Sequence, residues 1–216
     1  MARVTYVKSA RVRHNSDGTA KPLLNCDACQ KVIEVGSSYK HISIKTGAYS
    51  SRKLVRCAFC PTWQVWEYSN STSARTAQIS HEARTALESA ETVDEVTDAL
   101  QVAADTVREL ADEKREGAQN IEEGFGHPTS QSDELTSLAD ELDSWADALE
   151  QATVPDFPDP DDVDCPECEG KGTGGEDMDT CRECEGTGHP SEPTEEQLDE
   201  WRDEVANMSE LDDSPV

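Results

Sequence analysis

The feature that most constrains this chain of 216 residues is its set of eight cysteines, which form four Cys-x-x-Cys pairs. Such a pair turns both sulfurs toward one point, and two pairs supply the four ligands of a tetrahedral zinc site. The chain begins without an apolar leader, so we expect a reducing cytoplasmic location, where paired cysteines bind metal more often than they form disulfides. The alternative is disulfide or redox use. We predict two zinc ions, the first held by Cys26, Cys29, Cys57 and Cys60 and the second by Cys165, Cys168, Cys181 and Cys184.

The composition explains why this chain needs bound metal. Only 35% of the residues are hydrophobic and 5% aromatic, whereas 30% are charged and the net charge is −27. Self-repulsion of this size opposes compaction, and a single large core is not expected. Metal binding is one source of folding energy for small modules that bury little apolar surface. The composition therefore favours two small zinc modules over one large domain.

Charge is divided unevenly along the chain. Residues 1 to 63 hold 11 Lys and Arg against three acidic residues, a net charge of +8, and the remainder holds eight basic and 43 acidic residues, a net charge of −35. A basic segment suits a polyanion such as DNA or RNA. The alternative is that it pairs with the acidic helices of the same chain. The candidate nucleic-acid contacts, which lie in or beside a predicted β-hairpin, are Lys40, Lys45, Arg52, Lys53 and Arg56.

The C-terminal cysteines belong to an internal repeat. Cys165-Pro-Glu-Cys168-Glu-Gly-Lys-Gly172 and Cys181-Arg-Glu-Cys184-Glu-Gly-Thr-Gly188 both fit Cys-x-x-Cys-x-Gly-x-Gly. The glycines permit backbone angles that other residues resist. This repeat resembles the cysteine-rich zinc domain of DnaJ-type co-chaperones, over residues 165 to 188 only. The resemblance implies one zinc on these four cysteines and a surface that contacts other proteins.

The N-terminal cysteine pairs are 27 residues apart, a spacing that suits a zinc ribbon or treble clef closed around a β-hairpin. Ile33-x-x-Gly36-x-x-Tyr39 resembles treble-clef fingers of the LIM and poly(ADP-ribose) polymerase kinds. Trp63 and Trp66 either pack the core of this module or stack on bases, and core packing is the preferred interpretation. The opening module, residues 120 to 127 and the acidic tail together resemble uncharacterised zinc-knuckle proteins of phages and archaeal viruses.

Between the cysteine modules the hydrophobic pattern is helical. Apolar residues recur at spacings of three and four, which predicts helices over about 93–116 and 132–151 that fold back as an antiparallel hairpin. Gly117 and residues 124–130 are expected to end the first of them. The predicted fold is mainly α, with two small zinc-stabilised β or loop modules and a central helical hairpin. The expected segments are 1–70 (basic zinc module), 73–152 (acidic helices), 153–164 (extended Pro/Asp linker), 165–189 (zinc finger) and 194–216 (short helix and frayed acidic tail).

Two function classes remain open from the sequence. Four-thiolate zinc has no free position for water or substrate, and the histidines are scattered, so we predict structural metal and no enzyme activity. In the first class, the basic zinc module contacts DNA or RNA and the chain is regulatory. In the second class, the chain is a protein adaptor or chaperone-like module that uses its C-terminal finger or helices. No membrane contact is predicted, and the oligomeric state is left open.

Overall fold

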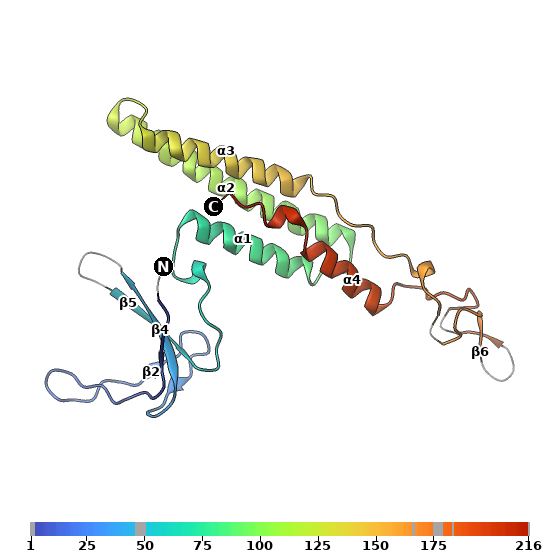
Figure 1. Cartoon of the computed structure of the whole chain (residues 1–216), viewed down its shortest axis with the longest axis horizontal. Helices are drawn as coiled ribbons and strands as arrows, with labels where there is room; N and C mark the ends of the chain where they lie inside the picture. Colours follow the sequence, from blue (N-terminus) through green and yellow to red (C-terminus); the bar gives the residue numbers. More distant parts are fainter. Residues whose placement is uncertain (1–2, 46–50, 166, 175–178, 183, 216) are drawn as a thin grey trace. The chain divides into compact units, whose positions relative to one another are not determined.

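The computed structural model describes residues 3–45, 51–165, 167–174, 179–182 and 184–215. It divides the chain into two compact units, Met1–Ser69 and Asn70–Val216. Small antiparallel sheets build the first unit and long helices dominate the second, so the prediction of a mainly helical chain with small β modules is confirmed (Figure 1). Among the described residues, no helix has both the length and the hydrophobicity that crossing a bilayer requires.

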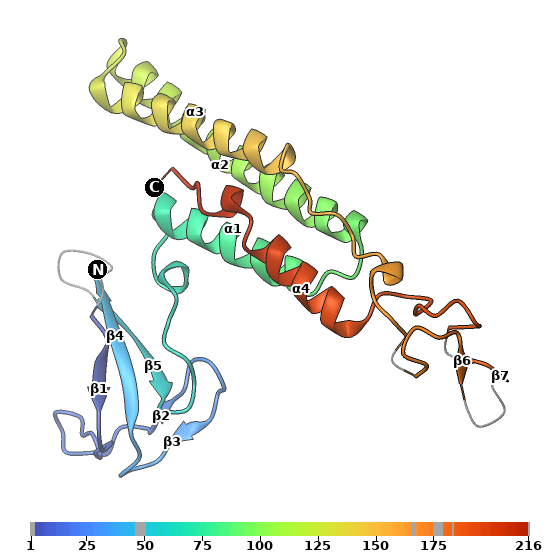
Figure 2. The same cartoon turned by 45° about the vertical axis from the view of Figure 1, so that its right-hand side comes forward.

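A three-stranded antiparallel sheet forms the centre of the first unit. Its order is β1 (Thr5–Val7), β4 (Tyr39–Lys45) and β5 (Ser51–Cys57), while β2 (Leu24–Asn25) pairs with β3 (Val32–Ile33) (Figure 2). Side chains alternate between the faces of a strand, so each face of the sheet receives its own small core. The two buried clusters are Ala10, Ile33 and Val55 on one face, and Ile42, Leu54 and Trp63 on the other.

The predicted helical hairpin is present in the second unit. Helices α2 (Val93–Phe125) and α3 (Ser130–Glu150) run side by side along their length (Figure 1). Of the residues expected in the seam, Leu100, Val107, Leu142 and Trp145 are buried. Leu138 is only partly buried at the edge of the core, and Ala139 takes the inner position.

Helix α2 is longer than the sequence predicted. Gly117 does not end it, and the helix continues until Gly126, which adopts the left-handed conformation (φ 75°). A glycine inside a helix costs only about 1 kcal/mol relative to alanine, and packing readily offsets this amount. Gly117 packs against Leu135 of α3, and a Cβ at residue 117 would lie in ordinary contact with the leucine Cδ1 at 3.6 Å. The tertiary contact with α3 therefore overrides the local propensity.

Ion pairs between arginines and carboxylates also join the two helices of the hairpin. Arg108 of α2 reaches Asp147 and Glu150 of α3 at 2.9 and 2.5 Å, and Arg115 likewise bridges to α3. These groups are exposed, and exposed pairs contribute little individually. They nevertheless place positive charge where two acidic helices approach each other, which reduces the repulsion between them.

The C-terminal segment is not the frayed tail that its acidic composition suggested. Helix α4 (Glu195–Ala206) and the residues after it return to helix α1 (Thr72–Leu87) and to the hairpin. The indole N–H of Trp145 donates to the carbonyl of Glu210 at 2.7 Å, and Leu211 is 2% exposed within the common core. Burial of Leu211, together with side-chain bonds from Trp145, Ser80 and Arg84, therefore holds an otherwise acidic segment.

The proline- and aspartate-rich linker is likewise held against α4. The ring of Phe157 meets the edge of Trp201 with centroids 5.1 Å apart, and the Trp201 indole N–H donates to the Pro155 carbonyl at 3.2 Å. Gln197 donates to the carbonyl of Asp159 at 3.0 Å. Residues 155–159 of the predicted linker thus lie against α4, and Pro160–Asp162 form a short 3-10 helix rather than extended chain.

Two four-cysteine clusters as candidate metal centres

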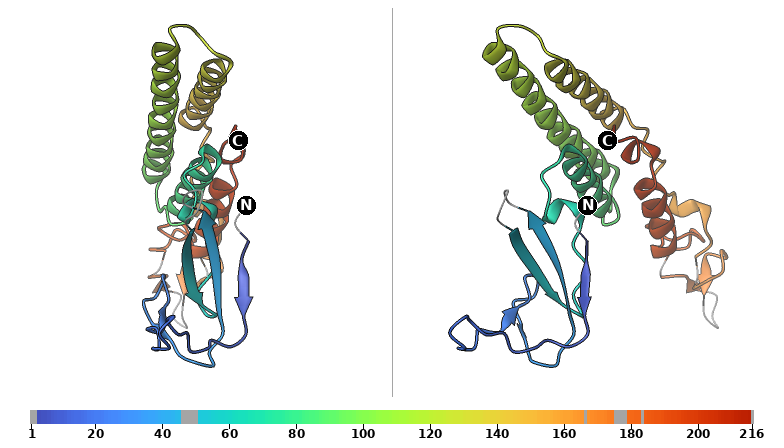
Figure 3. Two further views of the ribbon diagram at one scale, coloured as in Figure 1. Left: turned by 90° about the vertical axis from the view of Figure 1, so that its left-hand side faces the viewer. Right: turned by 60° about the vertical axis from the view of Figure 1, so that its left-hand side comes forward.

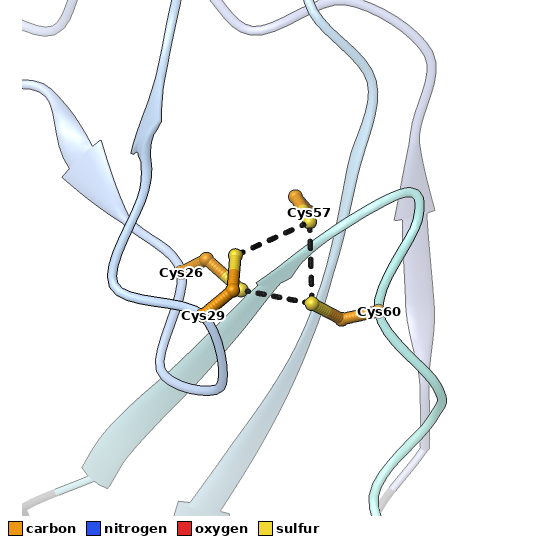
Figure 4. A group of neighbouring side chains, drawn as sticks. All are labelled: Cys26, Cys29, Cys57 and Cys60. Atoms are coloured by element: carbon orange, nitrogen blue, oxygen red, sulfur yellow. Dashed lines mark hydrogen bonds between the residues drawn. The ribbon is translucent and has the colours of Figure 1, made fainter.

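The four N-terminal cysteines gather at one point of the first unit. Cys26 and Cys29 lie in the turn between β2 and β3, Cys57 ends β5, and Cys60 follows it (Figure 4). The sulfur of Cys60 lies 3.6 Å from that of Cys26 and 3.5 Å from that of Cys57, and the Cys29 and Cys57 sulfurs are 3.9 Å apart. A tetrahedral zinc with bonds of about 2.3 Å places its sulfurs about 3.8 Å apart. The spacing suits one metal ion and is far longer than a disulfide of about 2.05 Å.

Backbone geometry and one carboxylate fix the first knuckle. Gln30 closes it with a left-handed backbone (φ 60°), where glycine is more usual. The next residue of the turn after Cys26, Asp27, donates its N–H to the carbonyl of Val55 at 2.8 Å and accepts the Val55 N–H through its carboxylate. Asp27 therefore ties the first knuckle to β5, the strand that leads into the second.

Two of the basic residues predicted to contact nucleic acid instead support the metal cluster. Lys40 is 6% exposed and its ammonium donates to the carbonyl of Cys60. Arg56, directly opposite Lys40 in the sheet, is 8% exposed, pairs with Glu67 and stacks 5.1 Å from the centroid of Trp63. This stacking helps to bury Trp63, and the prediction that Trp63 packs in the core of the module is confirmed. Lys40 and Arg56 are used internally, so they are not part of an exposed phosphate-binding surface.

The other candidate contacts occupy opposite faces of the sheet. Arg52 lies opposite Ile44 of β4, on the same face of the sheet as Lys40, and is exposed. Lys53 is exposed on the opposite face, where its ammonium lies 6.0 Å from the ring centroid of Tyr39. The side chain of Lys45 lies outside the described residues. The five predicted contacts therefore do not form one surface.

All four C-terminal cysteines are buried, and they alone make up the buried cluster found in the described part of the finger. The Cys165 and Cys181 sulfurs are 3.9 Å apart, and those of Cys168 and Cys184 are 3.6 Å apart. Throughout both clusters the ligand atoms lie within 4.8 Å of one another, and all eight cysteines are free of disulfides. Both clusters are therefore compatible with a metal ion.

The two repeats of the finger exchange equivalent contacts. The N–H of Cys165 donates to the carbonyl of Gly188 at 2.7 Å, and the N–H of Cys181 donates to the carbonyl of Gly172 at 3.0 Å. Gly172 (φ 68°) and Gly188 (φ 90°) each approach the backbone of the other repeat. A Cβ at Gly172 would lie 2.4 Å from the carbonyl oxygen of Gly186. The in-phase glycines of the sequence therefore serve close backbone approach between the repeats.

Replacing Gly172 by alanine is expected to abolish metal binding by the finger and to leave the first cluster loaded. The alanine would meet both an unfavourable backbone angle and a carbonyl oxygen at 2.4 Å, so the two knuckles must separate. The metal content should fall by one ion per chain. The matched control is Lys171→Ala, which changes an adjacent exposed side chain. Retention of both ions by the Gly172 variant would show that the close approach is not required.

The thiols of each cluster do not ionise alike. Burial raises the pKa of Cys26, but hydrogen bonds from the backbone of Cys29, Cys57 and Ala28 outweigh it and bring the pKa to about 6. Contact with neighbouring thiols raises the pKa of Cys60 to about 12. Backbone N–H donors thus stabilise the thiolate of Cys26, whereas the neighbouring sulfurs disfavour a second negative charge on Cys60. A bound cation removes that resistance, which fits the chemistry of a metal site.

Other basic residues gather on the N-terminal unit in a place that the sequence did not indicate. Lys8, Arg11, Arg13 and Lys21 line a hollow beside the sheet. These four residues are part of the charge of +8. They precede the first cysteine pair, however, whereas the sequence prediction placed the nucleic-acid contacts in the hairpin between the pairs.

Comparisons with protein-family models, with curated proteins and with solved structures found no match.

Proposed function

We propose that this chain is a non-enzymatic zinc protein whose N-terminal unit binds nucleic acid. The choice of zinc rests on four sulfur ligands at tetrahedral spacing in each cluster, which is the donor set that structural zinc prefers. Cys165, Cys168, Cys181 and Cys184 also have no apolar companions in their buried cluster within the described part of the finger, so the finger requires a ligand to hold it. Four thiolates leave no position for water or substrate, which supports a structural role.

The observation that carries the nucleic-acid assignment is the excess of cations without acidic partners on the N-terminal unit. In the described part of that unit, Arg56 with Glu67 is the sole ion pair. Asp27 is engaged by the backbone of Val55, and Asp17 by Thr19. Exposed lysines and arginines without carboxylate partners are available for phosphates, and neutralising phosphates releases counterions from nucleic acid.

A salt titration of the full-length, zinc-loaded chain tests this function. Fluorescence anisotropy with a labelled oligonucleotide should show binding at low salt, with log K falling linearly against log salt by about 0.7 to 0.9 per phosphate contact. The slope then counts the phosphates engaged. Absence of binding to both DNA and RNA at low salt would overturn the proposal. The alternative of a protein adaptor, suggested by the resemblance of the C-terminal finger to DnaJ-type zinc domains, would then be preferred.

A further inference from the structure

The N-terminal unit carries a hollow whose walls are basic and whose floor is apolar. Its volume is about 490 Å³, within the range of small-molecule and cofactor sites. Lys8, Arg11, Arg13 and Lys21 line it, and the core residues Leu24 and Ile33 belong to its floor. None of the described residues that line it is acidic. We call this hollow, with the segment 8–24 that borders it, the basic groove.

The segment that supplies the cations is held in place by the fold. Its root is fixed because Ala10 donates to the carbonyl of Ser37 and accepts from the N–H of Gly36, both at 2.8 Å. Its two limbs pair further out, where the N–H of Lys21 donates to the carbonyl of Arg13 at 2.7 Å. The Arg13 guanidinium donates to the carbonyl of Pro22 at 2.9 Å. The groove is thus bordered by a braced arm of the chain, coloured dark blue in Figure 3.

The charges of the groove extend onto the sheet. Burial, and then the positive charge of Arg13, lower the pKa of Lys53, which lies on the same face of the sheet as Tyr39. No described carboxylate forms an ion pair with Lys8, Arg11, Arg13, Lys21 or Lys53. A like-charged cluster of this kind is unfavourable by itself and becomes favourable when an anion enters it.

An aromatic ring borders the same groove. Tyr39 lines it, half-buried, and belongs partly to the core beneath. Tyr6 lies opposite Lys40 in the sheet, so its side chain is on the other face. Phosphates of a duplex would use the cations, but the bases of a duplex are stacked inside it and present no faces to a tyrosine or an apolar floor. A single strand offers both phosphates and exposed base faces, which stack on aromatic side chains with little sequence preference.

From this combination we infer that the basic groove is a binding site for single-stranded nucleic acid, with Lys8, Arg11, Arg13 and Lys21 on the phosphates and Tyr39 against a base. The inference rests on the proposed function and narrows it to one surface and one class of nucleic acid. DNA and RNA share the chemistry that the groove recognises. The metal cluster then contributes indirectly, because it holds the sheet on which the groove is built.

The test compares two charge-matched double variants of the full-length, zinc-loaded chain. Arg11→Glu with Lys21→Glu changes the groove, and Arg3→Glu with Arg52→Glu changes the same net charge at exposed residues that do not line it. The probes are labelled dT20, rU20 and a 20-base-pair duplex at one salt concentration. The groove variant should bind dT20 or rU20 at least tenfold more weakly than the control variant. Zinc content and circular dichroism should be the same for both.

A third variant, Tyr39→Leu, which keeps an apolar side chain against the core, separates base stacking from charge. It should weaken binding of the single strand by about tenfold without changing the salt slope, because stacking involves no phosphate. Equal loss of affinity in both double variants would place the binding surface elsewhere while leaving nucleic-acid binding intact. Duplex binding as tight as single-strand binding would overturn the single-strand inference alone. Failure of the unmodified chain to bind any probe would instead remove the proposed function itself.

Discussion

Removal of metal by a strong chelator is expected to unfold both cysteine modules while the helical hairpin remains folded. The finger has a buried cluster of four cysteines, and the N-terminal sheet has two clusters of three buried residues, so neither holds a large core in its described part. Structural zinc contributes about 10 to 16 kcal/mol in small zinc modules, and this binding energy is folding energy. The modules should therefore lose their structure almost completely.

The helices should survive because their core contains no cysteine among the described residues. That core extends from Ile79 to Leu211 and includes the seam of α2 and α3. Circular dichroism at 222 nm should fall only slightly on chelation, while amide dispersion in NMR spectra collapses for residues near the cysteines. Returning zinc should restore the dispersion. Loss of most of the helical signal would show that the helices depend on the metal modules.

The second large effect is expected from Leu142→Ala in the centre of the helical unit. Leu142 is fully buried between α3 and its neighbours. Truncating a buried leucine removes transfer free energy and leaves a cavity, which lowers the free energy of unfolding by about 2 to 5 kcal/mol. Urea denaturation followed by circular dichroism measures this loss.

The matched control for this variant is Leu138→Ala, one turn earlier on the same helix. Leu138 is only partly buried, so its truncation removes fewer contacts and leaves an opening to solvent rather than a closed cavity. The Leu142 variant should therefore be the less stable of the two. An unchanged unfolding midpoint in the Leu142 variant would mean that this seam does not hold the unit together.

Much of the helical unit could be predicted from the sequence because its cores follow helical spacing. Leu100, Val107, Leu142 and Trp145 lie where the periodicity placed them. The continuation of α2 past Gly117 depends on packing against α3, which no local pattern reports. Leu211 is a single apolar residue in an acidic segment, and its burial is decided by partners more than sixty residues away, such as Trp145.

The metal ligands could be predicted more completely than the surface. The short spacing of a Cys-x-x-Cys pair turns its two sulfurs toward one point, so the two clusters could be predicted from the spacing of the cysteines. The role of a basic residue, in contrast, depends on which face of the sheet it occupies and on what lies opposite. Lys40 and Arg56 face each other and bind carbonyls and Glu67, whereas the cations of the basic groove come from a segment with no regular pattern.

Elemental analysis of metal, with paired cysteine variants, tests the central claim most directly. The purified chain should contain two zinc ions. Cys26→Ser with Cys60→Ser should remove one ion, Cys165→Ser with Cys184→Ser should remove the other, and each remaining ion should stay bound through dialysis. The contrary result would be one zinc or none in the unmodified chain, or the loss of both ions when one cluster is changed.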